Sequence, residues 1–194
     1  TKASDEPEQY AAVEAKAKEI SAITSEFDAY MQSLKAGAVE TIEDPTDYEV
    51  MDKPDHFNNL FFTGENLKPE GQKFIDQMNK YRTEMVAILS DTAVAKKVAG
   101  ANEIIASIND TFGTGEVEKS DGTKQDWLNY HYEGFPLIAS LTKFSQMQAD
   151  VRTTESEVLS ALMQDQLISD ASMKNYKAIV VADKSAFFSG ENFS

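Results

Sequence analysis

Two long segments with helical apolar spacing constrain the fold of this chain more than any other feature. In the first, from about residue 5 to 42, eight of nine positions at alternating spacings of three and four are apolar: Tyr10, Val13, Ala17, Ile20, Thr24, Phe27, Met31, Leu34 and Ala38. This spacing predicts an amphipathic helix with a heptad-like seam, which Asp44 and Pro45 end. Such a helix is roughly 55 Å long, which is too long for a compact globule and favours a rod or bundle.

The second long segment begins at Pro136 and ends near Leu167. It is roughly 48 Å long by the same rise per residue, so we expect it to lie along the first helix. Its apolar positions are Leu137, Ile138, Leu141, Phe144, Met147, Val151, Val158, Leu159 and Leu162. The sequence therefore predicts a mainly α fold, an elongated helical bundle built on two long helices.

Shorter elements connect these two helices. A helix is predicted from Pro69 to about Leu89, and another helical stretch ends at Gly113. The polar connection at 114–126 carries the turn signal Asp121-Gly122. Two groups of aromatic residues are expected to close one end of the bundle: Tyr48, Phe57, Phe61 and Phe62, and then Trp127, Tyr130, Tyr132 and Phe135. The second group could instead form a binding platform, but closing the bundle is the favoured interpretation.

The pattern changes after Ser169 and Asp170. The β-branched density of 176–181 predicts one strand, and 186–188 predict the start of another. Because two strands alone are marginal in water, we interpret them as the first strands of a truncated β-sandwich domain. The predicted division is a helical domain at 1–172 and the start of a β domain at 173–194. The chain opens without an initiator methionine or a signal-peptide pattern, so we expect it to be an excised fragment.

Composition excludes several classes of function. The 33 acidic residues outnumber the 18 basic ones, which gives a net charge of −15. This surplus disfavours binding to nucleic acid and to anionic membrane surfaces. With no cysteine, the chain has neither zinc ribbons nor disulfides. No apolar run approaches the ~20 residues that span a bilayer.

No constellation of residues predicts catalysis, a cofactor or a metal. His56 and His131 stand 75 residues apart in aromatic contexts, which favours loop packing or exposure. The acidic run of Glu43, Asp44, Asp47, Glu49 and Asp52 lacks the spacing and the glycine of a calcium loop, and is interpreted as solvated charge. Asp150 with Thr154, and Arg152 with Glu155 or Ser156, are typical of surface pairs on one helix. We therefore expect that this protein is not an enzyme.

The last third of the chain resembles the GldM/PorM family, which serves gliding motility and type IX secretion in Bacteroidetes. The resemblance is carried by an ordered series of short segments, 134–140, 148–151, 155–158, 175–181 and 188–191. Its signature residues, for which we expect structural roles, are Gly134, Phe135, Pro136, Gln148, Asp150, Val151, Glu155, Val158, Gly190 and Glu191.

The resemblance implies a periplasmic fragment of a protein anchored to the inner membrane by one transmembrane helix outside these residues. It implies a homodimeric rod with a helical first domain and β-sandwich domains after it. With a GldL-like membrane partner the family forms a proton-driven motor, and the rod reaches outer-membrane components of the secretion and gliding apparatus. The proton-coupling residues lie in transmembrane segments, so no catalytic residue is carried over.

A competing hypothesis is a periplasmic ligand-sensing domain of a receptor, since such domains are also helical bundles beside a membrane helix. A receptor domain of this kind is followed by a second membrane helix. The predicted strands after Ser169 therefore favour the motor hypothesis.

Overall fold

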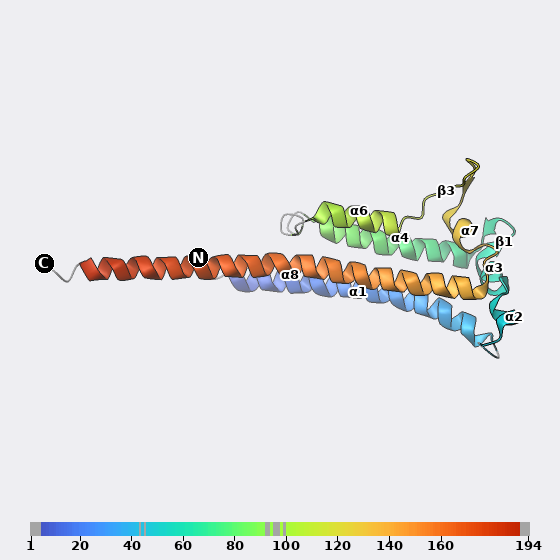
Figure 1. The fold of residues 1–194 in the computed structure, drawn as a ribbon, viewed down its shortest axis with the longest axis horizontal. Helices are drawn as coiled ribbons and strands as arrows, with labels where there is room; N and C mark the ends of the chain where they lie inside the picture. Colours follow the sequence, from blue (N-terminus) through green and yellow to red (C-terminus); the bar gives the residue numbers. More distant parts are fainter. Residues whose placement is uncertain are drawn as a thin grey trace.

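The computed structural model describes the backbone of residues 5–42, 44, 46–91, 94, 98 and 100–190, and side chains between 11 and 164 within those ranges. The fold is mainly α, an elongated bundle, as predicted (Figure 1). Its elements in chain order are α1 (Asp5–Glu40), α2 (Tyr48–Met51), α3 (Asp55–Phe61), β1 (Phe62–Thr63), β2 (Asn66–Leu67), α4 (Pro69–Ser90), α6 (Ala101–Thr111), β3 (Val117–Glu118), β4 (Lys124–Gln125), α7 (Trp127–Tyr132) and α8 (Leu137–Gly190).

The two long helices α1 and α8 lie side by side and antiparallel (Figure 1). The predicted seam of α1 is confirmed, because its described positions from residue 20 onward are all buried: Ile20, Thr24, Phe27, Met31, Leu34 and Ala38. Helix α1 ends at Glu40, close to its predicted end. Since apolar side chains recur on one stripe of each helix, burying both stripes requires the helices to pack along their length.

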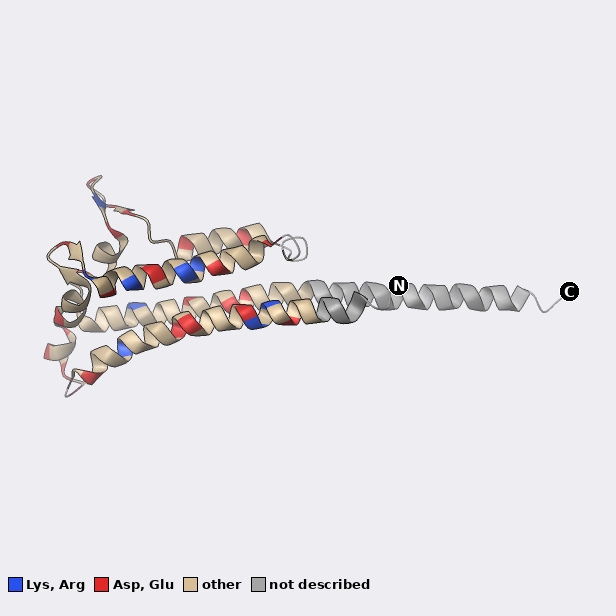
Figure 2. Ribbon diagram, turned by 180° about the vertical axis from the view of Figure 1, so that it is seen from behind, with Lys and Arg blue, Asp and Glu red and all other residues tan. Residues whose placement is uncertain are grey.

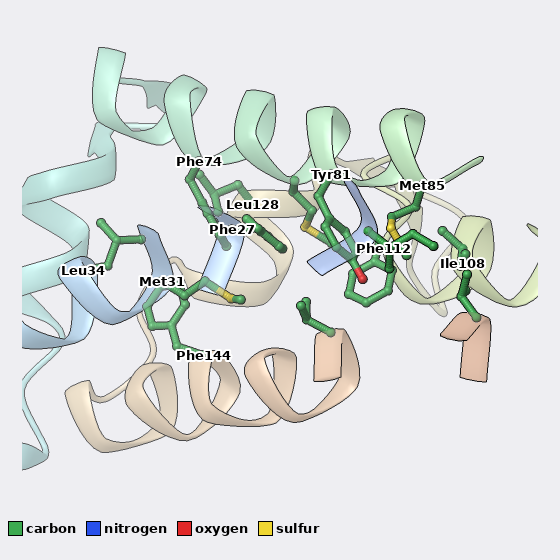
Figure 3. Close-up of a cluster of buried hydrophobic side chains, with 14 of the residues drawn as sticks. Phe27, Met31, Leu34, Phe74, Tyr81, Met85, Ile108, Phe112, Leu128 and Phe144 are labelled. Atoms are coloured by element: carbon green, nitrogen blue, oxygen red, sulfur yellow. The ribbon is translucent and has the colours of Figure 1, made fainter. Parts of the chain in front are cut away.

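Helices α4 and α6 form a second layer against this pair (Figure 1). Helix α4 begins with Pro69 at its first position and ends at Ser90, as the sequence predicts. Its buried face packs against α1 and the side chains of α8, where Phe74 contacts Phe144 and Tyr81 contacts Phe27. Met85 belongs to the same core and lies on the side of Phe112 and Ile108 (Figure 3). Helix α6 begins after Gly100, whose φ of +77° favours glycine.

An aromatic cluster closes one end of the bundle, as predicted. The Phe74 ring of α4 packs against Phe61 of α3 at 5.8 Å between centroids, Tyr132 of α7 at 5.7 Å and Phe144 of α8 at 5.4 Å. For Tyr48 and Tyr130 this prediction is wrong, because their side chains are 90% and 40% exposed. Its position in the sequence places a tyrosine near the end of the bundle, but it does not predict whether the side chain points into the core or into solvent.

Two short antiparallel hairpins complete the fold. In the first, Phe62 pairs with Leu67 and Thr63 with Asn66, and in the second, Val117 pairs with Gln125. The turn predicted at Asp121-Gly122 is confirmed. Gly122 has a φ of +81°, and Asp121 Oδ1 accepts hydrogen bonds from the backbone N–H and the hydroxyl of Thr123 at 2.9 and 2.6 Å.

The secondary structure at the C-terminus differs from the prediction. Helix α8 does not end near Leu167 but continues to Gly190, so the strands predicted at 176–181 and 186–188 are wrong. A short β-branched run fits a strand or a buried helix equally well by periodicity, and β-branched residues lower helix propensity only slightly. A growing helix adds one hydrogen bond per residue, whereas strands need a partner sheet. The domain boundary at residue 173 stays a prediction.

Candidate functional site

The seam between α1 and α8 carries a series of polar contacts beside its apolar core. Ser21, Asp28 and Lys35 stand seven residues apart on α1 and each bonds a side chain of α8. The Ser21 hydroxyl donates to Glu155 Oε1 at 2.7 Å, and Lys35 Nζ donates to Ser145 Oγ at 2.7 Å. A seven-residue period keeps side chains on one flank of paired helices, so these contacts fix the register of α1 against α8.

Asp28 is the centre of this series. Its Oδ2 accepts from Arg152 Nη2 at 2.7 Å and its Oδ1 accepts from Gln148 Nε2 at 2.9 Å, while Gln148 Oε1 accepts from Lys35 Nζ at 3.0 Å. The side chain of Asp28 is 19% exposed, against 67% for Arg152. The exposed ion pair alone contributes ~0–1 kcal/mol, whereas hydrogen bonds to a charged group contribute ~1.5–3 kcal/mol. Asp28 therefore ties two turns of α8 to α1.

The interpretation of the α8 pairs as surface pairs on one helix is wrong. Arg152 and Glu155 reach across to Asp28 and Ser21 on α1, and Thr154 is buried in the core. Sequence spacing shows which residues share a helix face, but not that a second helix covers the face. One feature of the sequence does indicate contacts between the two helices: Ser21, Asp28 and Lys35 recur every seven residues.

A layer of hydroxyl groups lies inside the seam. Thr24 of α1, Tyr81 of α4 and Thr154 of α8 are all buried, and the two threonine hydroxyls lie close enough to Tyr81 to act on its pKa. Burial raises the pKa of Tyr81 well above its usual range, so the phenol stays protonated. Within the described part of the chain, neither Thr24 Oγ1 nor the Tyr81 hydroxyl has a hydrogen-bond partner. This layer is a polar interruption in an otherwise apolar three-helix core.

A tight turn anchors the start of α8. Gly134 has a φ of +74°, and its N–H donates to Asn58 Oδ1 of α3 at 2.9 Å. The Leu137 N–H donates to the Lys53 carbonyl at 3.0 Å. Lys143, in the second turn of α8, places its Nζ 3.4 Å from the centroid of the Phe135 ring and donates to the His131 carbonyl. Burial lowers the pKa of Lys143, and the aromatic face compensates its charge.

The structure divides the predicted signature residues into three groups. Gln148 and Glu155 bond α1 across the seam, and Val151 and Val158 are fully buried in it. Gly134, Phe135 and Pro136 form the turn before α8, where the Pro136 carbonyl accepts from Ser140 N–H at 3.1 Å. Asp150 accepts from Gln146 within α8 at 2.9 Å, and Gly190 is the last residue of α8. Glu191 lies outside the described residues.

The polar groups do not converge on a catalytic or metal-binding arrangement in the described residues, where no group of three or more His, Asp or Glu is placed to hold a metal ion. Asp44 and Asp47, from the acidic run, bond backbone N–H groups of Thr46 and Glu49 at 2.8 and 2.9 Å. The Thr46 hydrogen bonds lower the pKa of Asp44. None of the helices in the described ranges combines the length and the apolarity that crossing a membrane requires.

We expect the stability of this domain to fall as the pH drops from about 7.5 to about 5.5. Burial lowers the pKa of both His56 and His131 below 6.5, and for His131 the positive charge of Lys143 adds to this. Because the unfolded chain binds more protons in this window, protonation favours unfolding. Thermal denaturation across these pH values measures the effect. Replacing both histidines by glutamine should flatten the dependence, and an unchanged slope in that variant would contradict the assignment.

The seam between α1 and α8 and the turn before α8 both lie in a part of the chain that matches a known family. A family described as the GldM N-terminal domain matches residues 1–165. The chain belongs to the GldM N-terminal domain family. The match covers α1 to α7 and the part of α8 that pairs with α1, and thus every seam contact described above. No curated protein matches the chain. Membership in the GldM family makes the chain a component related to gliding motility and type IX secretion.

Proposed function

We propose that this domain is the non-enzymatic periplasmic part of a proton-driven inner-membrane motor complex that powers type IX secretion and gliding motility. The observation that carries the proposal is the match of the GldM N-terminal domain to residues 1–165. The domain couples the membrane motor to outer-membrane components. It works as a homodimer in the periplasm, with a GldL-like partner that it meets through a transmembrane helix outside these residues.

The geometry of α1 and α8 suits the transmission of force. The two helices share a core in which Phe144, Val151 and Val158 stand seven residues apart and are fully buried. Bending or sliding such a pair breaks apolar contacts and polar bonds at several levels at once. A stiff element of this kind passes on a displacement that a flexible linker would absorb.

The polar bonds of the seam make this proposal testable. In the full-length protein in its native cells, the double variant Asp28→Ala and Glu155→Ala removes the bonds to Arg152, Gln148 and Ser21. Each charged hydrogen bond contributes ~1.5–3 kcal/mol, so the seam weakens while the apolar core is kept. We expect secretion and gliding speed to fall together, with membrane insertion unchanged.

Asp150→Ala is the matched control, because the hydrogen bond of Asp150 to Gln146 stays within α8. This variant should secrete and glide normally. If the double variant also behaved normally although its isolated domain had lost stability, the seam would not transmit force. A ligand-sensing domain would instead keep basal secretion in both variants and would gain thermal stability from a small solute.

A further inference from the structure

A pocket with an apolar wall opens at the end of the bundle, where the chain passes from α1 to α3. We call it the α2 pocket. Its volume is about 730 Å³, and it is lined by Thr46, Tyr48, Glu49, Met51, Asp52 and Ile138. The first five residues belong to the α2 segment, whereas Ile138 belongs to the first turn of α8. Two elements far apart in sequence therefore build one concave surface.

The apolar side chains of this pocket are exposed to an unusual degree. Tyr48 is 90% exposed and Ile138 is 50% exposed. Within the described residues, the Tyr48 side chain has no ring contact, ion pair or hydrogen bond, so the fold does not use it. A large aromatic side chain beside an apolar hollow is typical of a protein–protein contact, where tyrosine is enriched.

The backbone around the pocket is held in place before anything binds. Asp44 and Asp47 cap the α2 segment through the N–H groups of Thr46 and Glu49, and the Leu137 N–H ties Lys53 to the start of α8 at 3.0 Å. A surface held in this way loses little conformational entropy on binding. The pocket is therefore suited to receive an anchor side chain without rearranging.

The charge around the pocket defines the chemistry of its occupant. Between residues 40 and 56 the sequence holds seven acidic residues and one basic residue, Lys53. Glu49 and Asp52 line the pocket itself, and Figure 2 shows acidic residues at this end of the bundle. The same acidic rim on a second copy of this chain is repelled from it, whereas lysine and arginine side chains are attracted.

We propose that the α2 pocket docks a basic segment of another protein, with an aromatic or aliphatic side chain inserted between Tyr48 and Ile138 and lysine or arginine side chains on Glu49 and Asp52. The apolar anchor supplies affinity, and the acidic rim supplies orientation and rate of association. This inference rests on the pocket and does not depend on the motor role.

The test uses a displayed random peptide library as the probe, selected on the wild-type 194-residue chain and counter-selected on a Tyr48→Ser, Ile138→Ser variant. We expect enriched peptides to carry a large apolar residue flanked by lysine or arginine. In the counter-selected variant their affinity should drop by about tenfold or more, as at an interface hot spot. A Glu49→Gln, Asp52→Asn variant should weaken binding and reduce its dependence on salt.

Tyr130→Ser is the matched control, because Tyr130 is 40% exposed on α7 and lies outside the pocket. Its affinity for the enriched peptides should equal that of the wild type, and melting curves should show all variants folded. The proposal is overturned if no peptide depends on Tyr48 and Ile138, or if the dependent peptides are not basic. It is also overturned if sedimentation shows self-association that the Tyr48→Ser, Ile138→Ser variant abolishes, since a second copy would then occupy the pocket.

Discussion

Replacing Phe74 with alanine lowers the free energy of unfolding of this domain by about 3–5 kcal/mol, the usual cost of truncating a buried phenylalanine. The Phe74 side chain of α4 is fully buried at the point where five elements meet. Besides the rings of Phe61, Tyr132 and Phe144, it contacts Trp127 at 6.1 Å between centroids and Tyr30 of α1 at 6.3 Å. Its loss removes the common partner of these rings, and neighbours held on four other elements cannot collapse into the space.

Urea denaturation followed by circular dichroism measures this effect. A typical domain is stable by only ~5–15 kcal/mol, so a loss of this size shifts the midpoint far or leaves the domain partly unfolded at rest. Tyr48→Ala is the control, because its 90% exposed side chain contributes little to folding, and it should change stability by less than ~0.5 kcal/mol. A Phe74→Ala midpoint equal to that of the control would mean that the aromatic cluster does not hold this end together.

The second large effect is expected for proline at Val151, in the middle of the paired part of α8. Proline removes the hydrogen bond from residue 151 to the carbonyl of Met147 and clashes with that turn, at a cost of ~3 kcal/mol or more. Val151 is fully buried, so the kink acts directly on the seam with α1. We expect lower stability in urea and, in cells, loss of secretion and gliding with the protein still inserted in the membrane.

Val151→Ala separates helix continuity from packing. It keeps the backbone hydrogen bond and removes two buried methyl groups, at a cost of about 2 kcal/mol. Cells with this variant should retain most of their secretion. If Val151→Ala abolished secretion as completely as Val151→Pro, side-chain packing rather than an unbroken helix would be the requirement; if Val151→Pro secreted normally, the rigid seam would have no part in the function.

Apolar periodicity predicted the fold correctly where a long run of periodic residues is compatible with only one structure. The α1 seam from Ile20 to Ala38, the start of α4 at Pro69 and the closing role of Trp127 and Tyr132 were predictable because burial follows the helical period. It failed at 176–181, where the run was short and strand and helix were equally compatible with its pattern. It also failed at Tyr48, where a single aromatic residue in a short helix has no period to place it.

The long amphipathic helices of this chain, and the stripe of each helix that is buried, follow from the amino-acid sequence alone, because the spacing of apolar residues repeats over many turns. Which polar residues meet depends on how the helices pack. Asp28 and Arg152 stand 124 residues apart, and no local rule relates them until α1 and α8 are packed antiparallel in one register. The same holds for the α2 pocket, because Tyr48 and Ile138 become neighbours only when the turn at Gly134 brings the start of α8 back beside α2.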